Sequence, residues 1–231
     1  MYYYNHHMTH GQFELPLIYQ IIAVFLLAVT GSMVAIEKKY DFSGLLIMSF
    51  IAGASSAIIR DGIFLNNIPI IIKQWWYLVA IILAPVLTAI LMPYIRKYLT
   101  VFVAIDALGL GIFGIIAAQM TLDQNLSILS AIFVGLIGAI SGGFLRDIVT
   151  KSKPLLLKPG QYYFTAALFG IILFILLTVY IKIDAQIAAI IGILTTFIIR
   201  MLSYFLNWHT TPAENISKKI LSNINNKNIS Q

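Results

Sequence analysis

Residues 127–149, SILSAIFVGLIGAISGGFLRDIV, form an apolar stretch that ends in an arginine, an aspartate and two apolar residues. The stretch is too long and too poor in charge for a surface helix, and about 20 apolar residues span a bilayer as a helix. Gly135, Gly138 and Gly142 are spaced three and then four residues apart, and Arg146 follows after four more. This spacing places them on one stripe of a helix. We therefore predict a membrane helix with a flat face that carries a charge near its end.

A second stretch with the same pattern lies 86 residues earlier and ends in Arg60 and Asp61, as the later one ends in Arg146 and Asp147. The residues that correspond to the three glycines are again small, namely Ser49, Ala52 and Ser56. Outside these positions the two stretches share little identity. The pattern predicts an internal repeat that is carried by the small stripe and by the Arg-Asp pair.

The composition of the chain is that of an integral membrane protein, because 60% of its residues are hydrophobic, 10% are charged and its mean hydropathy is +0.90. The formal net charge of +6 does not indicate a nucleic-acid partner, since most Lys and Arg residues lie in short loops or in the tail. The absence of cysteine excludes disulfides and thiolate chemistry. We predict no metal site and no cofactor, and expect membrane lipid as a partner.

Seven segments are long and apolar enough to span a membrane. They cover roughly residues 15–36, 43–60, 75–93, 100–119, 127–146, 162–181 and 185–206. An odd number of spans places the two termini on opposite sides of the membrane. Three helices followed by three more then begin on opposite faces, which makes the two sets an inverted repeat. We expect Arg60 at the outer end of the second span and Arg146 at the inner end of the fifth.

The loop cations predict that the N-terminus is outside and the C-terminus cytoplasmic. This orientation leaves two lysines, Lys73 and Lys182, on the outer side and gathers ten cations on the inner side: Lys38, Lys39, Arg96, Lys97, Lys151, Lys153, Lys158, Lys218, Lys219 and Lys227. The predicted fold class is an all-α polytopic membrane protein. Its predicted parts are a polar N-terminal arm (1–14), a first three-helix repeat (15–94), a second, inverted three-helix repeat (95–182), a seventh transmembrane helix (183–208) and a polar cytoplasmic tail (209–231).

Small polar residues and glycines cluster about one turn before each arginine, and these are Ser55, Ser56, Ser141, Gly142 and Gly143. Glycine and serine weaken a helix and free backbone carbonyls for an ion or for water. We predict that they line an ion pathway together with Arg60, Asp61, Arg146 and Asp147. The alternatives are a packing seam without a transport role and arginines that anchor the helices at the membrane interface.

Asp106 is the one carboxylate well inside a span, and an acid at that depth is a candidate for function. We assign it to the ion pathway, with an N-terminal helix cap as the alternative. The equivalent position in the first half is Gln20. We assign Gly109, Gly111 and Gly114, which follow it, and Gly135 and Gly138 of the later stripe to helix packing.

Three motifs resemble the prokaryotic trimeric intracellular cation (TRIC) channel family, which is also described as a glycine transporter family. They are DALGLGIFGIIAAQ (106–119), SGGFLRDIVTKSKPLLLKPGQYYFTAALFG (141–170) and IIRMLSYFLNWHTTP (198–212). The resemblance covers about residues 15–212. It departs from the family pattern in the first half, where Ser55-Ser56-Ala57 replaces a glycine triplet. It implies a homotrimer in the cell inner (plasma) membrane of a prokaryote, one cation pore per protomer, broken second and fifth helices, and potassium and sodium as permeant ions.

The residues by themselves leave channel and carrier open. A channel needs a continuous wet path with weak binding, whereas a secondary transporter of a small solute such as glycine needs a closed site near the midplane and two alternating states. An enzyme is not predicted, because the sequence offers no nucleophile with an adjacent base at a common depth.

Overall fold

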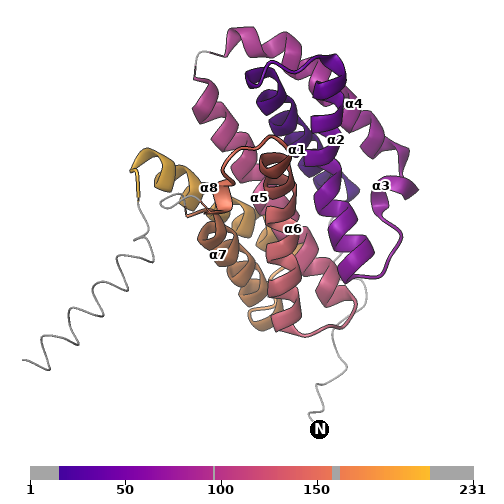
Figure 1. The fold of residues 1–231 in the computed structure, drawn as a ribbon. Coiled ribbons are helices and arrows are strands. Elements are labelled where there is room, and N and C mark those ends of the chain that lie inside the picture. Colours follow the sequence, from indigo (N-terminus) through magenta and orange to yellow (C-terminus); the bar gives the residue numbers. More distant parts are fainter. Residues whose placement is uncertain (1–15, 96, 158–161, 209–231) are drawn as a thin grey trace, which may run out of the picture.

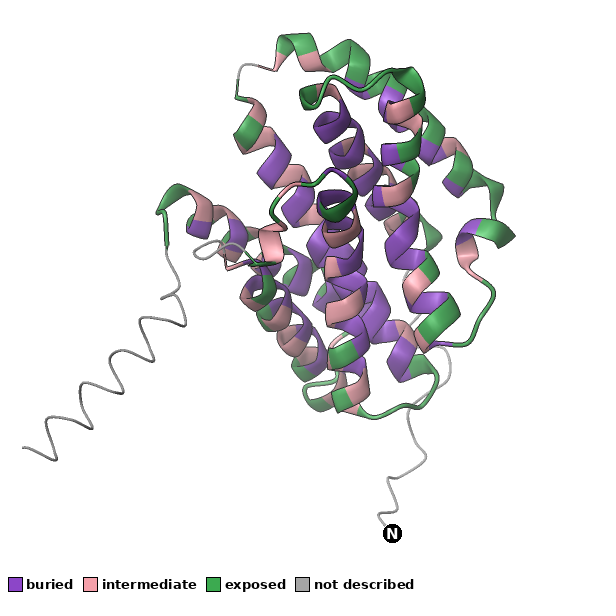
Figure 2. Ribbon diagram, in the orientation of Figure 1, coloured by how far each residue is buried: buried purple, intermediate pink, exposed green. Residues whose placement is uncertain are grey.

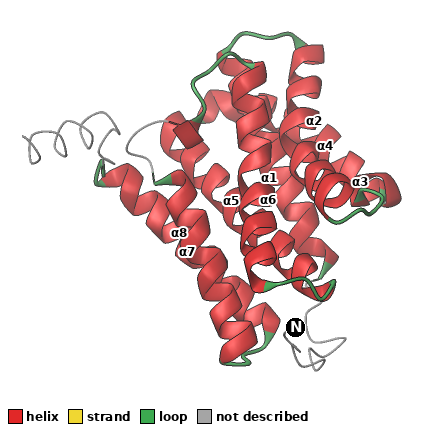
Figure 3. Ribbon diagram, turned by 60° about the horizontal axis from the view of Figure 1, so that its bottom comes forward, coloured by secondary structure: helices red, strands yellow, loops and turns green. Residues whose placement is uncertain are grey.

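The structure is a computed structural model that describes residues 16–95, 97–157 and 162–208. The predicted N-terminal arm and cytoplasmic tail lie outside these residues. The described residues form helices and connecting loops (Figures 1 and 3). The elements are α1 Leu17–Glu37, α2 Phe42–Ile58, the π-helix η1 Ile59–Phe64, α3 Ile70–Lys73, α4 Trp75–Leu91, η2 Met92–Tyr94, α5 Tyr98–Asp123, α6 Ile128–Val149, η3 Leu155–Leu157, α7 Tyr163–Ile175, the π-helix η4 Leu176–Tyr180 and α8 Ala185–Phe205.

Seven helices of the described chain are long and apolar enough to cross a membrane, and they coincide with the seven predicted spans to within a few residues. Polar side chains set several of their starts. The carboxylate of Asp41 accepts the backbone N–H of Gly44 at the start of α2 (2.8 Å), and Ser127 does the same for Ser130 at the start of α6 (3.1 Å). The short helix α3, directly after Pro69, was not predicted.

The helices pack as two groups of three, with α1, α2 and α4 in one and α5, α6 and α7 in the other. Helix α8 lies against α5 and α7. Helix α5 is central, since it contacts α1 of the other group as well as α8, and most of its residues are buried. Figure 2 shows buried residues facing the interior and exposed ones on the outer faces. Many exposed residues are large and apolar, as on α4, where Ile82 and Ile90 are both 56–58% exposed. Such a surface suits contact with lipid.

The two groups meet between α1 and α5 and also where α2 crosses α6, which runs in the opposite direction (Figure 1). The backbone N–H of Gly142 donates to Ser56 Oγ over 2.9 Å, and these residues are 86 positions apart, the offset of the predicted repeat. The hydroxyl of Ser141 lies 3.3 Å from the same oxygen. Contact between equivalent residues is expected on the two-fold axis of an inverted repeat.

Arg60 and Arg146 each follow this crossing by four residues, which is about 6 Å along a helix axis. They diverge from it in opposite directions, as the inverted repeat requires. Arg146 lies in the last turn of α6, and Arg60 lies in the π-helix η1, which ends the second span at Phe64. Both arginines therefore stand near the ends of their spans, as expected.

The expectation of broken second and fifth helices is wrong for the fifth. Helix α6 is a continuous α-helix through Gly142 and Gly143. A Cβ atom at Gly142 would lie 2.7 Å from the backbone oxygen of Ala52, so this glycine permits the close crossing of α2 and α6. The second span does change geometry, since α2 passes into the π-helix η1, which contains Arg60 and Asp61. A π-helical turn in a span is a common feature of functional sites.

Candidate functional site

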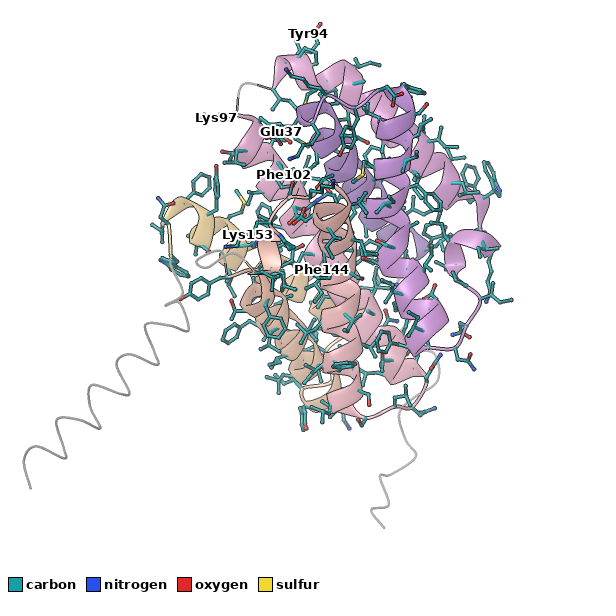
Figure 4. All side chains as sticks on the ribbon, in the orientation of Figure 1. Glu37, Tyr94, Lys97, Phe102, Phe144 and Lys153 are labelled. Carbon is teal, nitrogen blue, oxygen red and sulfur yellow. The ribbon has the colours of Figure 1, made fainter. Side chains whose placement is uncertain are left out.

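Arg146 lies at the centre of a polar cluster and is fully buried, as is Asp106. Its Nη1 donates to Asp106 Oδ1 (2.8 Å) and to the hydroxyl of Thr30 (2.9 Å), and its Nε donates to Asp147 Oδ1 (2.9 Å). The guanidinium carbon lies 4.8 Å from the ring centroid of Phe102, which Figure 4 labels. We call these five residues the Arg146 half-site. It joins α6 to α5 and, through Thr30, to α1 of the other group.

Arg60 lies in a second cluster, and it is also fully buried. Its Nε donates to Asp61 Oδ1 over 2.6 Å, and its Nη2 lies 3.4 Å from the side-chain oxygen of Gln20 on α1. We call these three residues the Arg60 half-site. Gln20 is only partly buried, but both arginines are enclosed by protein, which does not fit arginines that anchor a helix at the membrane interface.

The two half-sites follow one plan. In each, the arginine is bonded through Nε to the aspartate that follows it, and the other oxygen of that aspartate accepts a backbone N–H from the first residue of the next short helix, α3 or η3. These N–H groups belong to Ile70 and to Leu155, at 2.9 Å in both cases. The third member comes from the first helix of each repeat, as Gln20 or Asp106. Each aspartate therefore ties its arginine to the short helix that follows the span.

Buried charges of both signs occur in equal number among the described residues: the arginines are Arg60, Arg146 and Arg200, and the aspartates are Asp61, Asp106 and Asp147. Isolated charges are costly in a membrane protein, and pairing offsets much of that cost. Arg200 comes from α8, outside the repeats, and its guanidinium carbon lies 5.0 Å from the ring centroid of Tyr163. A Cβ atom at Gly143 would lie 2.7 Å from the Tyr163 hydroxyl and 3.5 Å from Arg146 Nη2, so this glycine leaves room between the two residues.

Several buried polar atoms of the two half-sites and the crossing have no hydrogen-bond partner among the described residues. They are Arg60 Nη1, Arg146 Nη2, Asp106 Oδ2, Ser55 Oγ and Tyr77 Oη. Buried polar groups in proteins are nearly always satisfied by protein, water or a ligand. These atoms therefore mark places where water or a ligand could be bound inside an otherwise apolar bundle. No group of three or more side chains that could hold a metal ion occurs in the described ranges.

The predicted pathway residues lie at the crossing and in the half-sites on either side of it. Asp106 of α5 is bonded to Arg146 of α6. Asp106 is not an N-terminal cap, since α5 begins eight residues earlier at Tyr98. The glycines assigned to packing lie at helix contacts. Gly114, Gly135 and Gly138 face residues across the α5–α6 contact, Gly109 faces Leu27, and Gly111 faces Ile193 of α8. Their roles stay predictions.

Sequence reasoning missed Thr30, Phe102, Tyr163 and Arg200 as parts of the site. Threonine and aromatic residues are too common in membrane helices to stand out. Two signals were nevertheless present, because Arg200 is a charge inside the seventh span, and Tyr163 corresponds to Tyr77 at the 86-residue offset of the repeat. Both tyrosines are buried.

Comparisons with known proteins give matches along most of the chain. The model of a family described as glycine transporter matches twice, over residues 17–93 and 103–179. The UPF0126 inner membrane protein YadS of Escherichia coli K12 is 25% identical over 191 residues, which cover 82% of this chain and 90% of that protein. The structure of the TRIC trimeric intracellular cation channel orthologue from Rhodobacter sphaeroides is similar with a TM-score of 0.75 and 25% identity, covering 80% of this chain and 94% of that one. A further TRIC cation channel structure is similar with a TM-score of 0.70 and 26% identity, covering 84% of this chain and 95% of that one.

Proposed function

Since this chain belongs to the TRIC channel family, which is also described as the glycine transporter family, we propose that it is a cation channel of a prokaryotic plasma membrane. In this proposal it is a homotrimer with one potassium-permeable pore in each protomer. The name of the Rhodobacter sphaeroides relative, a trimeric intracellular cation channel orthologue, supports the trimer and the permeant ion class.

The observation that carries the proposal is the pair of buried Arg-Asp half-sites on opposite sides of the α2–α6 crossing. A route for ions between the two repeats would pass the crossing, where Ser55, Ser56 and Ser141 supply hydroxyls. A free arginine would repel cations, since two unit charges 4 Å apart interact with about 4 kcal/mol at an effective dielectric constant of 20. Asp61, Asp106 and Asp147 neutralise the arginines, so cations can pass a polar route that carries little net positive charge.

Reconstitution of the purified protein into a planar bilayer tests this function. With a potassium chloride gradient across the bilayer, we expect discrete unitary currents whose reversal potential shifts toward the potassium equilibrium potential. Protein-free detergent carried through the same preparation is the control. Bilayers that stay silent although liposomes from the same batch contain folded protein would contradict the proposal.

A carrier of a small zwitterion such as glycine is the second candidate. One observation favours it, because Arg146 Nη2 and Asp106 Oδ2 are buried and have no partner among the described residues. The first could donate to a carboxylate and the second could accept from an ammonium group. Saturable uptake of labelled glycine into liposomes, together with silent bilayers, would favour this candidate over the channel.

The proposed orientation, with the N-terminus outside, can be tested with single cysteines because the chain has none of its own. Lys73→Cys and Lys153→Cys form a matched pair, since both lysines are exposed. We expect a membrane-impermeant maleimide to label Lys73→Cys in intact cells and Lys153→Cys only after the cells are opened. The reverse pattern would show that the orientation is opposite to the one proposed. Labelling of both variants in intact cells would contradict an odd number of spans between Lys73 and Lys153.

A further inference from the structure

The two half-sites share a plan but differ in how firmly they hold their arginine. Arg146 Nη1 has two close acceptors, the carboxylate of Asp106 (2.8 Å) and the hydroxyl of Thr30 (2.9 Å). Arg60 has only the amide oxygen of Gln20 at 3.4 Å in this place, and one terminal nitrogen of each arginine has no partner among the described residues. The bonds from Nε to the following aspartate are close in both.

The differences follow from three substitutions between the repeats. At the 86-residue offset that relates Ser56 to Gly142, the Arg146 partners Asp106, Phe102 and Thr30 correspond to Gln20, Pro16 and Ile116. Gln20 is neutral, Pro16 has no aromatic ring for a guanidinium to stack on, and Ile116 cannot accept a hydrogen bond. None of the three side chains supplies the carboxylate, the ring or the hydroxyl that Arg146 has as partners.

The sequence difference with the most direct effect is Gln20. A guanidinium makes a charge-assisted hydrogen bond to either acceptor, but a carboxylate adds the attraction between opposite charges, which a neutral amide cannot supply. The contact from Arg60 to Gln20 is also long for a hydrogen bond. Release of Arg60 from its third partner therefore costs less than release of Arg146.

We propose that, because of Gln20, the Arg60 half-site holds its arginine less firmly than the Arg146 half-site does. Arg60 then leaves its position when the channel opens, while Arg146 stays paired. This inference rests on the proposed channel function. It assigns Gln20 as a positioning residue that acts through Arg60, and it makes the two ends of the pathway unequal although the repeats are related by symmetry.

The isosteric variant Gln20→Glu tests the proposal in single-channel recordings. A carboxylate in place of the amide should hold Arg60 more firmly and lower the open probability about tenfold, because it adds attraction between opposite charges to the hydrogen bond that the amide already accepts. Gln20→Met removes the acceptor and should raise the open probability. Gln186→Glu makes the same chemical change at an exposed position of α8 and is the matched control. An open probability for Gln20→Glu that equals the wild-type value would overturn the proposal.

Thermal denaturation of the purified protein tests how firmly Arg60 is held, and it does not depend on a current measurement. Gln20→Glu should raise the melting midpoint by about 3–6 °C for each tenfold gain in stability, whereas Gln186→Glu should leave it unchanged. A midpoint for Gln20→Glu at or below that of the wild type would overturn the inference. If wild-type bilayers are silent but the melting midpoint of Gln20→Glu rises as predicted, the channel function is contradicted. The weaker hold on Arg60 is then still supported.

Discussion

Arg146→Ala is expected to destabilise the protein more than the same change at Arg60. Without the guanidinium, Asp106 and Asp147 lose the cation to which both are bonded, and loss of one partner of a buried ion pair costs about 3–5 kcal/mol. For a chain of this size we expect the melting midpoint in detergent to fall by roughly 10 °C. Arg60→Ala is the matched comparison. Its melting midpoint should fall less, because it leaves one aspartate without its arginine instead of two. Equal midpoints for the two variants would contradict this ranking.

Arg146→Lys separates the charge of Arg146 from its geometry. Arg146 bonds Asp147 through Nε and both Asp106 and Thr30 through Nη1, and an ammonium group cannot reach three partners in that fixed arrangement. We expect folding to recover in part, while single-channel conductance or open probability stays different from wild type. An arginine that only anchors the helix would tolerate lysine. Records of Arg146→Lys that match wild type would therefore contradict a place for Arg146 in the pathway.

Gly142→Leu is expected to abolish current while the protein still inserts into the membrane. A Cβ atom at Gly142 would meet the Ala52 oxygen and Leu27 Cδ1 at 2.7 Å each, so a leucine must push α2 and α6 apart at their crossing. Leucine is favoured in lipid, and insertion should therefore survive. The control is Gly62→Leu, where a Cβ atom meets only Pro69 Cγ at 3.8 Å. We measure membrane protein yield and potassium flux for both variants, and wild-type flux in Gly142→Leu would mean that the close crossing is dispensable.

The spans and the repeat could be predicted because they depend on local composition. A run of about 20 apolar residues has few alternatives to a membrane helix, and the seven predicted spans agree with the helices. The offset of 86 residues also places Ser56 on Gly142 at the crossing, although only the small stripe and the Arg-Asp pair indicated it. The sequence alone was sufficient here because each feature lies within one segment.

The partners of the arginines could not be predicted, since they depend on the register between helices. Nothing in the sequence indicates that Thr30 of the first repeat reaches Arg146 of the second, 116 positions away. Glycine pairs are equally ambiguous. Gly142 and Gly143 suggested a break in the helix, whereas α6 stays continuous and Gly142 serves a close contact. Only the position of the neighbouring helix distinguishes these two uses of glycine.

The most direct test of the central claim, that cations pass between the repeats at the crossing, is modification of Ser55→Cys during recording. Ser55 lies next to the crossing residue Ser56, and its hydroxyl has no partner among the described residues. The native chain has no cysteine, so a cationic methanethiosulfonate reagent would react at this position alone. We predict a progressive and irreversible loss of most of the current, with no loss for the exposed control Gln186→Cys. Current that persists although mass spectrometry shows complete modification of Ser55→Cys would contradict the account.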